Sequence, residues 1–449
     1  MPTTTKRGSH PVAARILLAG FLGFVLAGAF LLMLPISNAQ GAWTPFLTAI
    51  FTSTSAVCVT GLIVVDTATY YTTFGKAVIL LLIQLGGFGY AVTYSILIMA
   101  LRRKMSRHDQ ETIRSGLNLP HLGRQREILR LVLISTACFE LLGLLLVMPA
   151  FMAYRGGGAG VFDALFQAVS AFNNAGFSTF SDNLMSFSAN PLVGLVLPTM
   201  VIIGGIGVYV QADLWERFVT RRSKGLSLHT MVVLRATLLL IAGGMILSLL
   251  FEWNNPLTLG GFSFGEKLLN AYSMSVYPRT CGFNTINYAN IMPATMWMTV
   301  LFMFIGASPG GTGGGVKTTT ATMVIFATLN TFRNRTSTVL FGRKLPAKAL
   351  LNSYALVTVW VTILLLATSA MSHFDPGLDI GNIVFEAVSA LGTVGNSRGI
   401  TALLSEQSRI VLILLMLMGR IGPITIGSIA FRQSVPDLVH CPLEDVLVG

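Results

Sequence analysis

One motif recurs four times along this chain of 449 residues, and it limits the folds that the chain can adopt. In each copy an aromatic residue stands ten positions before a glycine. The four pairs are Phe51 and Gly61, Phe166 and Gly176, Tyr272 and Gly282, and Phe385 and Gly395. The copy that ends at Gly282 departs most from the others. Four similar units at near-constant spacing indicate a structure assembled from internal repeats.

The composition places these repeats in a lipid bilayer. The chain is 53% hydrophobic and only 11% charged, whereas soluble domains contain about 25% charged residues. Its net charge of +12 does not indicate nucleic-acid binding, because the basic residues fall between apolar stretches. The cysteines have neither a disulfide nor a zinc spacing; they are Cys58, Cys138, Cys281 and Cys441.

Each repeat is predicted to contain an outer helix, a short helix that ends at the glycine motif, and a second outer helix. The outer helices are predicted at 16–36, 74–101, 128–152, 191–218, 230–251, 292–329, 349–371 and 405–431. The short helices are predicted at 44–56, 160–172, 265–277 and 380–391. A bilayer core of about 30 Å requires about 20 helical residues, so the short helices should be re-entrant. We therefore expect an all-α polytopic membrane protein with eight spanning helices around a pseudo-fourfold pore.

The domain boundaries follow this plan. The expected segments are repeat 1 (1–101), a cytoplasmic loop (102–126), repeat 2 (127–218), a cytoplasmic loop (219–229), repeat 3 (230–332), a cytoplasmic loop (333–347), and repeat 4 with a C-terminal tail (348–449). The loops between repeats are rich in Lys and Arg. By the positive-inside rule they and both termini are expected in the cytoplasm. The first apolar run is longer than the core of a signal peptide, so we expect an uncleaved helix.

The four glycine motifs are the predicted functional sites. A helix can break inside a membrane only where its bare backbone lines a cavity or packs in protein. Backbone carbonyls around such a cavity can replace the water shell of a cation, and glycine permits the dihedrals that this requires. An ordinary turn is the alternative for any single glycine. The predicted ion-binding residues are Val59, Thr60, Gly61, Asn174, Ala175, Gly176, Thr280, Cys281, Gly282, Thr393, Val394 and Gly395.

A glycine-rich loop within repeat 3, residues 306–317, is predicted to act as a mobile gate below these motifs. Its proline and many glycines are incompatible with a continuous helix. It is not a phosphate-binding loop, because Val316 stands before Lys317 where that motif requires glycine. The predicted gating residues are Gly306, Ser308, Pro309, Gly310, Gly311, Thr312, Gly313, Gly314, Gly315, Lys317 and Arg420. Glycine pairs at 86–87 and 204–205 predict close helix packing.

Arg420 carries a charge inside an apolar helix, a placement that costs a few kcal/mol and usually has a function. It could repel cations or hold the glycine-rich loop by donating hydrogen bonds to carbonyls. Extension of the Arg420 or Lys317 side chain to the membrane surface is the alternative. Glu140 and Asp213 are further acids within apolar helices. No set of residues has a spacing suited to catalysis, so we do not expect an enzyme.

Together these motifs resemble those of the Trk/Ktr/HKT superfamily of potassium transporters. The matching stretches are residues 55–62, 173–178, 279–285, 308–318 and 419–423. Eight predicted spans make the chain most similar to the membrane subunit (KtrB type) of Ktr systems. The resemblance implies potassium uptake in the plasma membrane, and glycine at position 61 implies preference for potassium.

The same resemblance implies a homodimer with one pore per protomer. It also implies a KtrA-like cytoplasmic ring of nucleotide-binding regulatory subunits and stimulation by sodium. No cofactor is expected on this chain, with K⁺ as its substrate and the nucleotide on the partner. Two alternatives remain: a sodium-permeable transporter of the same fold, and a non-conducting subunit associated with a membrane ATPase.

Overall fold

The computed structural model describes residues 10–100, 125–221, 225–335 and 337–422, and this part of the chain is mostly helical. Parts of five predicted segments lie outside it. They are residues 1–9 and 101 of repeat 1, the first loop up to residue 124, residues 222–224 of the second loop, residue 336 of the third loop, and repeat 4 with its tail beyond Gly422.

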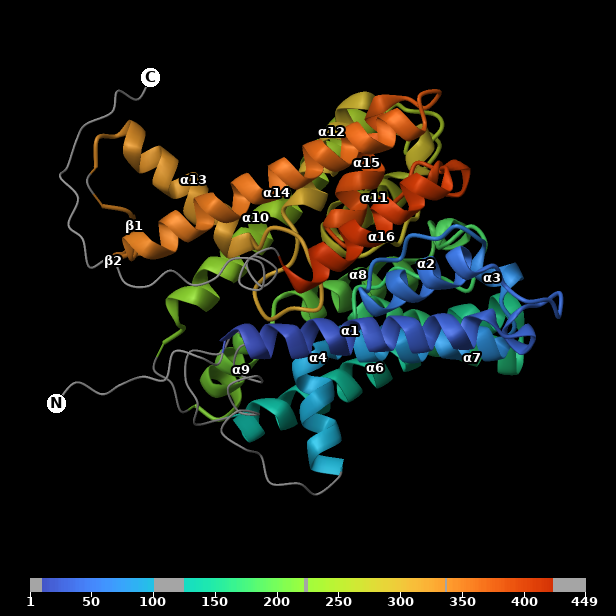
Figure 1. Cartoon of the computed structure of the whole chain (residues 1–449). Coiled ribbons are helices and arrows are strands. Elements are labelled where there is room, and N and C mark those ends of the chain that lie inside the picture. Colours follow the sequence, from blue (N-terminus) through green and yellow to red (C-terminus); the bar gives the residue numbers. More distant parts are fainter. Residues whose placement is uncertain (1–9, 101–124, 222–224, 336, 423–449) are drawn as a thin grey trace.

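The first two repeats contain the predicted short helices between longer ones (Figure 1). Repeat 1 consists of α1 (His10–Met33), η1 (Pro35–Ser37), α2 (Phe46–Val57), α3 (Thr67–Tyr70) and α4 (Thr73–Ala100). Repeat 2 consists of α6 (Gln125–Arg155), α7 (Gly157–Phe172), η2 (Met185–Phe187), α8 (Pro191–Gly205), α9 (Val208–Leu214) and η3 (Trp215–Val219).

The last two repeats follow the same order. Repeat 3 consists of α10 (Leu228–Glu252), α11 (Phe264–Thr280), η4 (Tyr288–Asn290), α12 (Pro293–Phe304) and α13 (Thr318–Phe332). A two-stranded antiparallel hairpin, β1 (Val339–Leu340) and β2 (Arg343–Lys344), leads into repeat 4. Repeat 4 consists of α14 (Ala347–Phe374), α15 (Ile380–Leu391), η5 (Thr401–Leu403) and α16 (Glu406–Ile421). The four predicted short helices are thus confirmed as α2, α7, α11 and α15.

Local sequence fixes the start of two short helices. The side chain of Asp379 accepts a hydrogen bond from the backbone N–H of Asn382 at 3.1 Å and caps α15. Ser263 and Glu266 form a capping box at the start of α11. Such caps satisfy backbone donors that a helix leaves unpaired at its N-terminus.

The second outer helix is interrupted in the first three repeats, and in the fourth its described part ends at Gly422. Glycines with left-handed backbone mark three of these four positions: Gly89 (φ +68°) within α4, Gly207 (φ +94°) between α8 and α9, and Gly422 (φ +86°) after α16. In repeat 3 the glycine-rich loop separates α12 from α13. The predictions of continuous helices at 74–101 and 191–218 are therefore wrong. A left-handed backbone conformation breaks a right-handed helix, and glycine adopts it without steric cost.

These breaks also limit how many helices could cross a membrane by themselves. Among the described residues three helical stretches are long and apolar enough: Leu129–Arg155 within α6, Leu228–Glu252 and Ala347–Phe374. The stretch Pro191–Gly205 with Val208–Val219, bent by 97°, is a fourth if it counts as one span. Three of the other predicted spans appear as shorter apolar helices: Leu18–Met33, Thr73–Gly89 and Pro293–Phe304.

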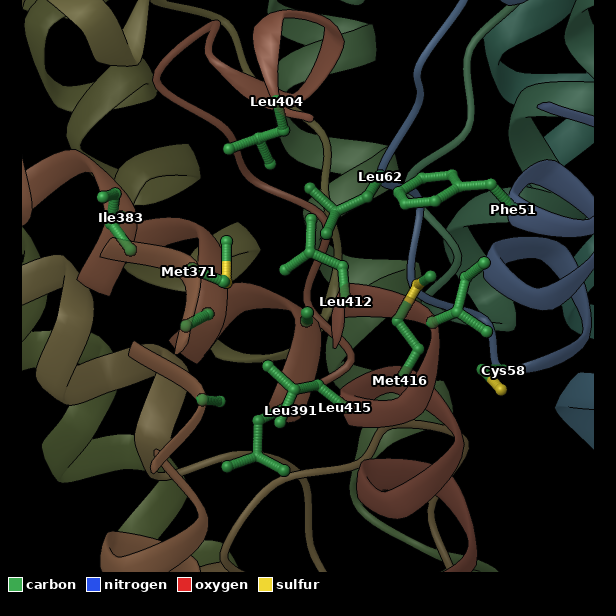
Figure 2. Close-up of a cluster of buried hydrophobic side chains, with 14 of the residues drawn as sticks. Phe51, Cys58, Leu62, Met371, Ile383, Leu391, Leu404, Leu412, Leu415 and Met416 are labelled. Carbon is green, nitrogen blue, oxygen red and sulfur yellow. The ribbon is translucent and has the colours of Figure 1, made fainter. Parts of the chain in front are cut away.

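Buried hydrophobic clusters join each repeat to the next and the fourth to the first. The cluster in Figure 2 packs Phe51, Cys58 and Leu62 of repeat 1 against Met371, Leu391 and Met416 of repeat 4, among others. Three further clusters pair repeat 1 with repeat 2, repeat 2 with repeat 3, and repeat 3 with repeat 4. The short helices contribute to all four clusters, so their C-terminal ends are held close together.

Candidate functional site

Three of the four short helices end in the same hydrogen-bonded turn. After α2, the N–H of Val59 donates to the carbonyl of Ala56 (3.1 Å) and the N–H of Thr60 to that of Ser55 (2.8 Å). After α7 the same bonds run from Asn174 to Ala171 and from Ala175 to Ser170; after α15 they run from Thr393 to Ala390 and from Val394 to Ser389. This pair of bonds is the Schellman motif, which satisfies the last carbonyls of a helix.

The turn requires a left-handed residue, and none of the three is glycine. The φ angle is +57° at Val59, +62° at Asn174 and +49° at Thr393. Asparagine tolerates this conformation, whereas the β-branched Val59 and Thr393 are true outliers. All three side chains are fully buried. Such strain costs on the order of 1–3 kcal/mol, persists only where the surroundings enforce it, and is concentrated at functional sites. Sequence reasoning missed these strained positions.

The glycines two residues later are also left-handed, with φ of +91° at Gly61, +71° at Gly176 and +99° at Gly395. Serine hydroxyls from the short helices fix two of them. The N–H of Gly61 donates to Ser55 Oγ and that of Gly395 to Ser389 Oγ, both at 3.0 Å. In repeat 2, Ser170 Oγ instead donates to the carbonyl of Phe177 at 2.8 Å.

The third motif is built differently. Helix α11 continues to Thr280, and Cys281 N–H donates to the carbonyl of Tyr277 in the ordinary helical pattern. Gly282 does not have a left-handed backbone, and Val276 occupies the position of the three serines. The predicted end of this short helix at residue 277 is therefore wrong. Thr280 is helical rather than part of an extended segment.

The four glycines nevertheless lie against one another in a closed ring. A methyl group on Gly61 would lie 2.2 Å from the carbonyl oxygen of Ala175, and one on Gly176 would lie 2.2 Å from the nitrogen of Gly282. The corresponding distance from Gly282 to Gly395 is 2.8 Å, and from Gly395 to the carbonyl oxygen of Thr60 it is 2.0 Å. All twelve residues predicted to bind the ion are buried. The fold thus brings the four predicted segments together.

Glycines in the second outer helices make this close approach possible. A methyl group on Gly86, Gly204 or Gly419 would lie within about 2 Å of the carbonyl oxygen of the last residue of α2, α7 or α15. These last residues are Val57, Phe172 and Leu391. Close packing at the first two glycine pairs was predicted and is confirmed. In each of these repeats the helix breaks three residues later, at the left-handed glycine described above.

The glycine-rich loop packs against the ring. The N–H groups of Ser308 and Thr312 donate to the carbonyls of Gly205 and Gly204, at 3.1 and 3.3 Å, and Val208 N–H donates to the carbonyl of Gly310. The loop also reaches the fourth motif, where Gly314 N–H donates to Thr393 Oγ1 at 2.9 Å. The loop is therefore fastened both to the break between α8 and α9 and to a strained residue of the ring.

Arg420 and Lys317 both donate to carbonyls of this loop. The guanidinium of Arg420 donates to the carbonyl of Thr312 and to that of Gly86 in α4. The ammonium of Lys317 donates to the carbonyl of Gly313 at 2.7 Å. Of the two roles considered for Arg420, the contacts match the one in which it holds the loop.

Comparison with known proteins agrees with this architecture. The family model described as TrkH, cation transport protein, matches residues 14–437. The chain is 36% identical to Ktr system potassium uptake protein B of Bacillus subtilis, covering 97% of this chain and 96% of that one. It is 34% identical to potassium/sodium uptake protein NtpJ of Enterococcus hirae, covering 95% and 94%.

A solved structure has the same fold. The potassium transporter TrkH from Vibrio parahaemolyticus matches with a TM-score of 0.74 at 16% identity, covering 95% of this chain and 86% of that one. The resemblance to the Trk/Ktr/HKT superfamily is thereby confirmed, and the chain belongs to the TrkH family of cation transport proteins.

Proposed function

We propose that this protein takes up potassium across the plasma membrane through the ring formed by its four glycine motifs. The observation that carries the proposal is the closed contact of Gly61, Gly176, Gly282 and Gly395 at the ends of four short helices. The name of the B. subtilis relative, a potassium uptake protein of the Ktr system, supports the choice of ion.

The ion would be held by backbone carbonyls. A dehydrated cation needs several oxygens at short range, and extended backbone on either side of a glycine presents them in sequence. The side chains before the four glycines differ (Thr60, Ala175, Cys281 and Val394), which favours the backbone as the common ligand. We further propose that eight spanning segments surround this path with pseudo-fourfold symmetry. Both termini would then lie in the cytoplasm.

The glycine-rich loop would close this path from below, with Arg420 as the side chain that holds it. A loop fastened by only one or two hydrogen bonds each to α8, α9, α16 and the fourth motif could be released when those elements shift. Deletion of residues 310–314 is expected to raise ion flux. Unchanged or lower flux at normal surface expression would contradict the gate.

Regulation is proposed to come from outside the chain. The Ktr system named for two relatives supports a homodimeric membrane subunit on a KtrA-like cytoplasmic ring that binds nucleotide, with sodium as an activator. Purification of the chain from membranes together with its cytoplasmic partners would test this arrangement.

The direct experiment is rescue of a cell that lacks potassium uptake. Growth at low potassium after expression of this chain is expected, and failure of an expressed, membrane-inserted protein to restore uptake would contradict the proposal. The relative named as a potassium/sodium uptake protein favours one alternative, a sodium-permeable transporter. Competition between K⁺ and Na⁺ during uptake distinguishes the two.

A further inference from the structure

Glu140 is an acidic residue that the proposed function does not use. It lies near the middle of Leu129–Arg155, one of the helical stretches that could span a membrane. Placing a charged side chain at such a depth in a membrane costs several kcal/mol of free energy. Residues of this kind therefore usually have a function. Among the described residues Glu140 has no cationic partner, and its contacts are with amides.

Glu140 contacts the side-chain amides of Gln84 in α4 and of Asn173, the residue that follows α7. Asn173 Nδ2 donates to Glu140 Oε1 at 2.9 Å, and lies 3.1 Å from Gln84 Oε1 and 2.9 Å from the carbonyl of Val169. Asn173 is fully buried. One amide group therefore joins the second segment of the glycine ring, residues 174–176, to α6 and to α4.

This amide directly precedes a residue with left-handed backbone. Asn173 is the C-cap of α7, and the next residue, Asn174, is one of the three left-handed residues of the ring. The equivalent positions in the other repeats are Cys58, Arg279 and Gly392. In the described part of the chain none of these three contacts a carboxylate, so this brace is specific to repeat 2.

The same amide also contacts the break in α4. A methyl group on Gly87 would lie only 1.8 Å from Asn173 Oδ1, and Gly87 stands two residues before the left-handed Gly89. The Asn173 side chain is thus enclosed between the acid of α6 and the backbone of α4. Its position is set by both helices.

We propose that Glu140 is a positioning residue for ion selectivity, which rests on the potassium-uptake function proposed above. As a hydrogen-bond acceptor it fixes the side chain of Asn173. Asn173 in turn keeps Asn174 in its left-handed conformation and holds the second ring segment at a fixed distance from the other three. Without the acceptor this segment relaxes, and a ring that can contract also accommodates the smaller sodium ion.

The test compares three variants in uptake assays on cells lacking other potassium uptake. Glu140→Ala is expected to lower the preference for K⁺ over Na⁺ about tenfold, as the loss of one hydrogen bond to a charged group predicts. It should raise the KM for K⁺ more than it lowers the maximal rate. Glu140→Gln keeps an acceptor oxygen and should restore most of the preference.

Asp213→Ala is the matched control, because Asp213 is also an acid near a membrane helix but accepts its hydrogen bond from the N–H of Ser227. It should leave ion preference unchanged. If Glu140→Ala does not reach the membrane, Asn173→Ala removes the same hydrogen bond from its other side and should give the same loss of preference.

Normal ion preference in membrane-inserted Glu140→Ala, or equal loss in Glu140→Gln, would overturn the inference. Absence of potassium uptake by the unmodified protein would instead overturn the proposed function, so the two failures are distinguishable.

Discussion

The first, second and fourth segments of the glycine ring differ from the third in what holds them. The three similar segments leave their helices through a Schellman turn with a left-handed residue at 59, 174 or 393. The third is a helix end with ordinary backbone, held by its neighbours. Thr280 Oγ1 lies 2.6 Å from the side-chain amide of Asn174, and Asn183 Nδ2 donates to the carbonyl of Gly282 at 3.3 Å.

The difference shows that the four glycines can occupy equivalent positions in the ring although the backbone turns before them are not the same. Four glycines meet in one ring, yet only three of the segments are fixed by their own short helix. The third belongs to the repeat whose second outer helix contains the glycine-rich loop. We infer that the segment without a local brace is the one most exposed to movement of the glycine-rich loop. The following predictions either sharpen this distinction or break it.

The largest effect is expected at the ring glycines. Gly395→Ala should reduce uptake of Rb⁺, a potassium substitute, at least tenfold, because a left-handed residue with a side chain costs about 1–2 kcal/mol and the new methyl group would lie 2.0 Å from Thr60 O. Gly282→Ala, without a left-handed φ, should lose less uptake and more of its selectivity against Na⁺. If Gly395→Ala and Gly282→Ala changed Rb⁺ uptake and selectivity equally at matched surface expression, the distinction between the third segment and the other three would be contradicted.

Packing glycines should have the next largest effect. In Gly419→Ala the methyl group would lie 2.0 Å from the carbonyl oxygen of Leu391, so overpacking should lower the free energy of unfolding by about 1–3 kcal/mol. Gly243→Ala in α10 is the control, since nothing lies within 4 Å of its new methyl group. Thermal unfolding in detergent measures both. A Gly419→Ala protein as stable as the control would contradict the packing argument.

A smaller effect is expected at the serine braces. Ser389→Ala leaves the buried N–H of Gly395 without its acceptor, which costs about 1–3 kcal/mol and should reduce potassium selectivity. Ser408→Ala removes a buried hydroxyl that has no hydrogen-bond partner among the described residues, and its selectivity should be normal. Identical ion competition curves for the two variants would show that the brace has no function.

The smallest effect is expected where repeat 3 is given the missing serine. Val276→Ser should not stabilise the protein, because the third segment has no Schellman turn for the hydroxyl to brace. A buried, unpaired hydroxyl costs about 1–3 kcal/mol in proteins, so a destabilisation within this range is expected in thermal unfolding, with no change in ion selectivity. An increase in stability would show that the third segment can adopt the same helix end as the others.

Repeated local patterns in the sequence predicted the short helices and the meeting of the four motifs. The left-handed residues were not predictable, because Val59 and Thr393 are β-branched and locally disfavour this backbone. Their conformation is imposed by tertiary packing. The break at Gly207 was not predicted, because residues 191–210 are almost continuously apolar in sequence and favour one continuous helix. The contact of Glu140 with Asn173 joins elements that are distant in sequence, so no local pattern reports it.

The central claim is that carbonyls around the four glycines bind a dehydrated cation. Crystals of the protein grown with rubidium in place of potassium would test it most directly, through the anomalous signal of the ion. The account predicts a peak enclosed by Gly61, Gly176, Gly282 and Gly395. An ordered ion elsewhere in the molecule, with none inside this ring at saturating rubidium, would contradict it.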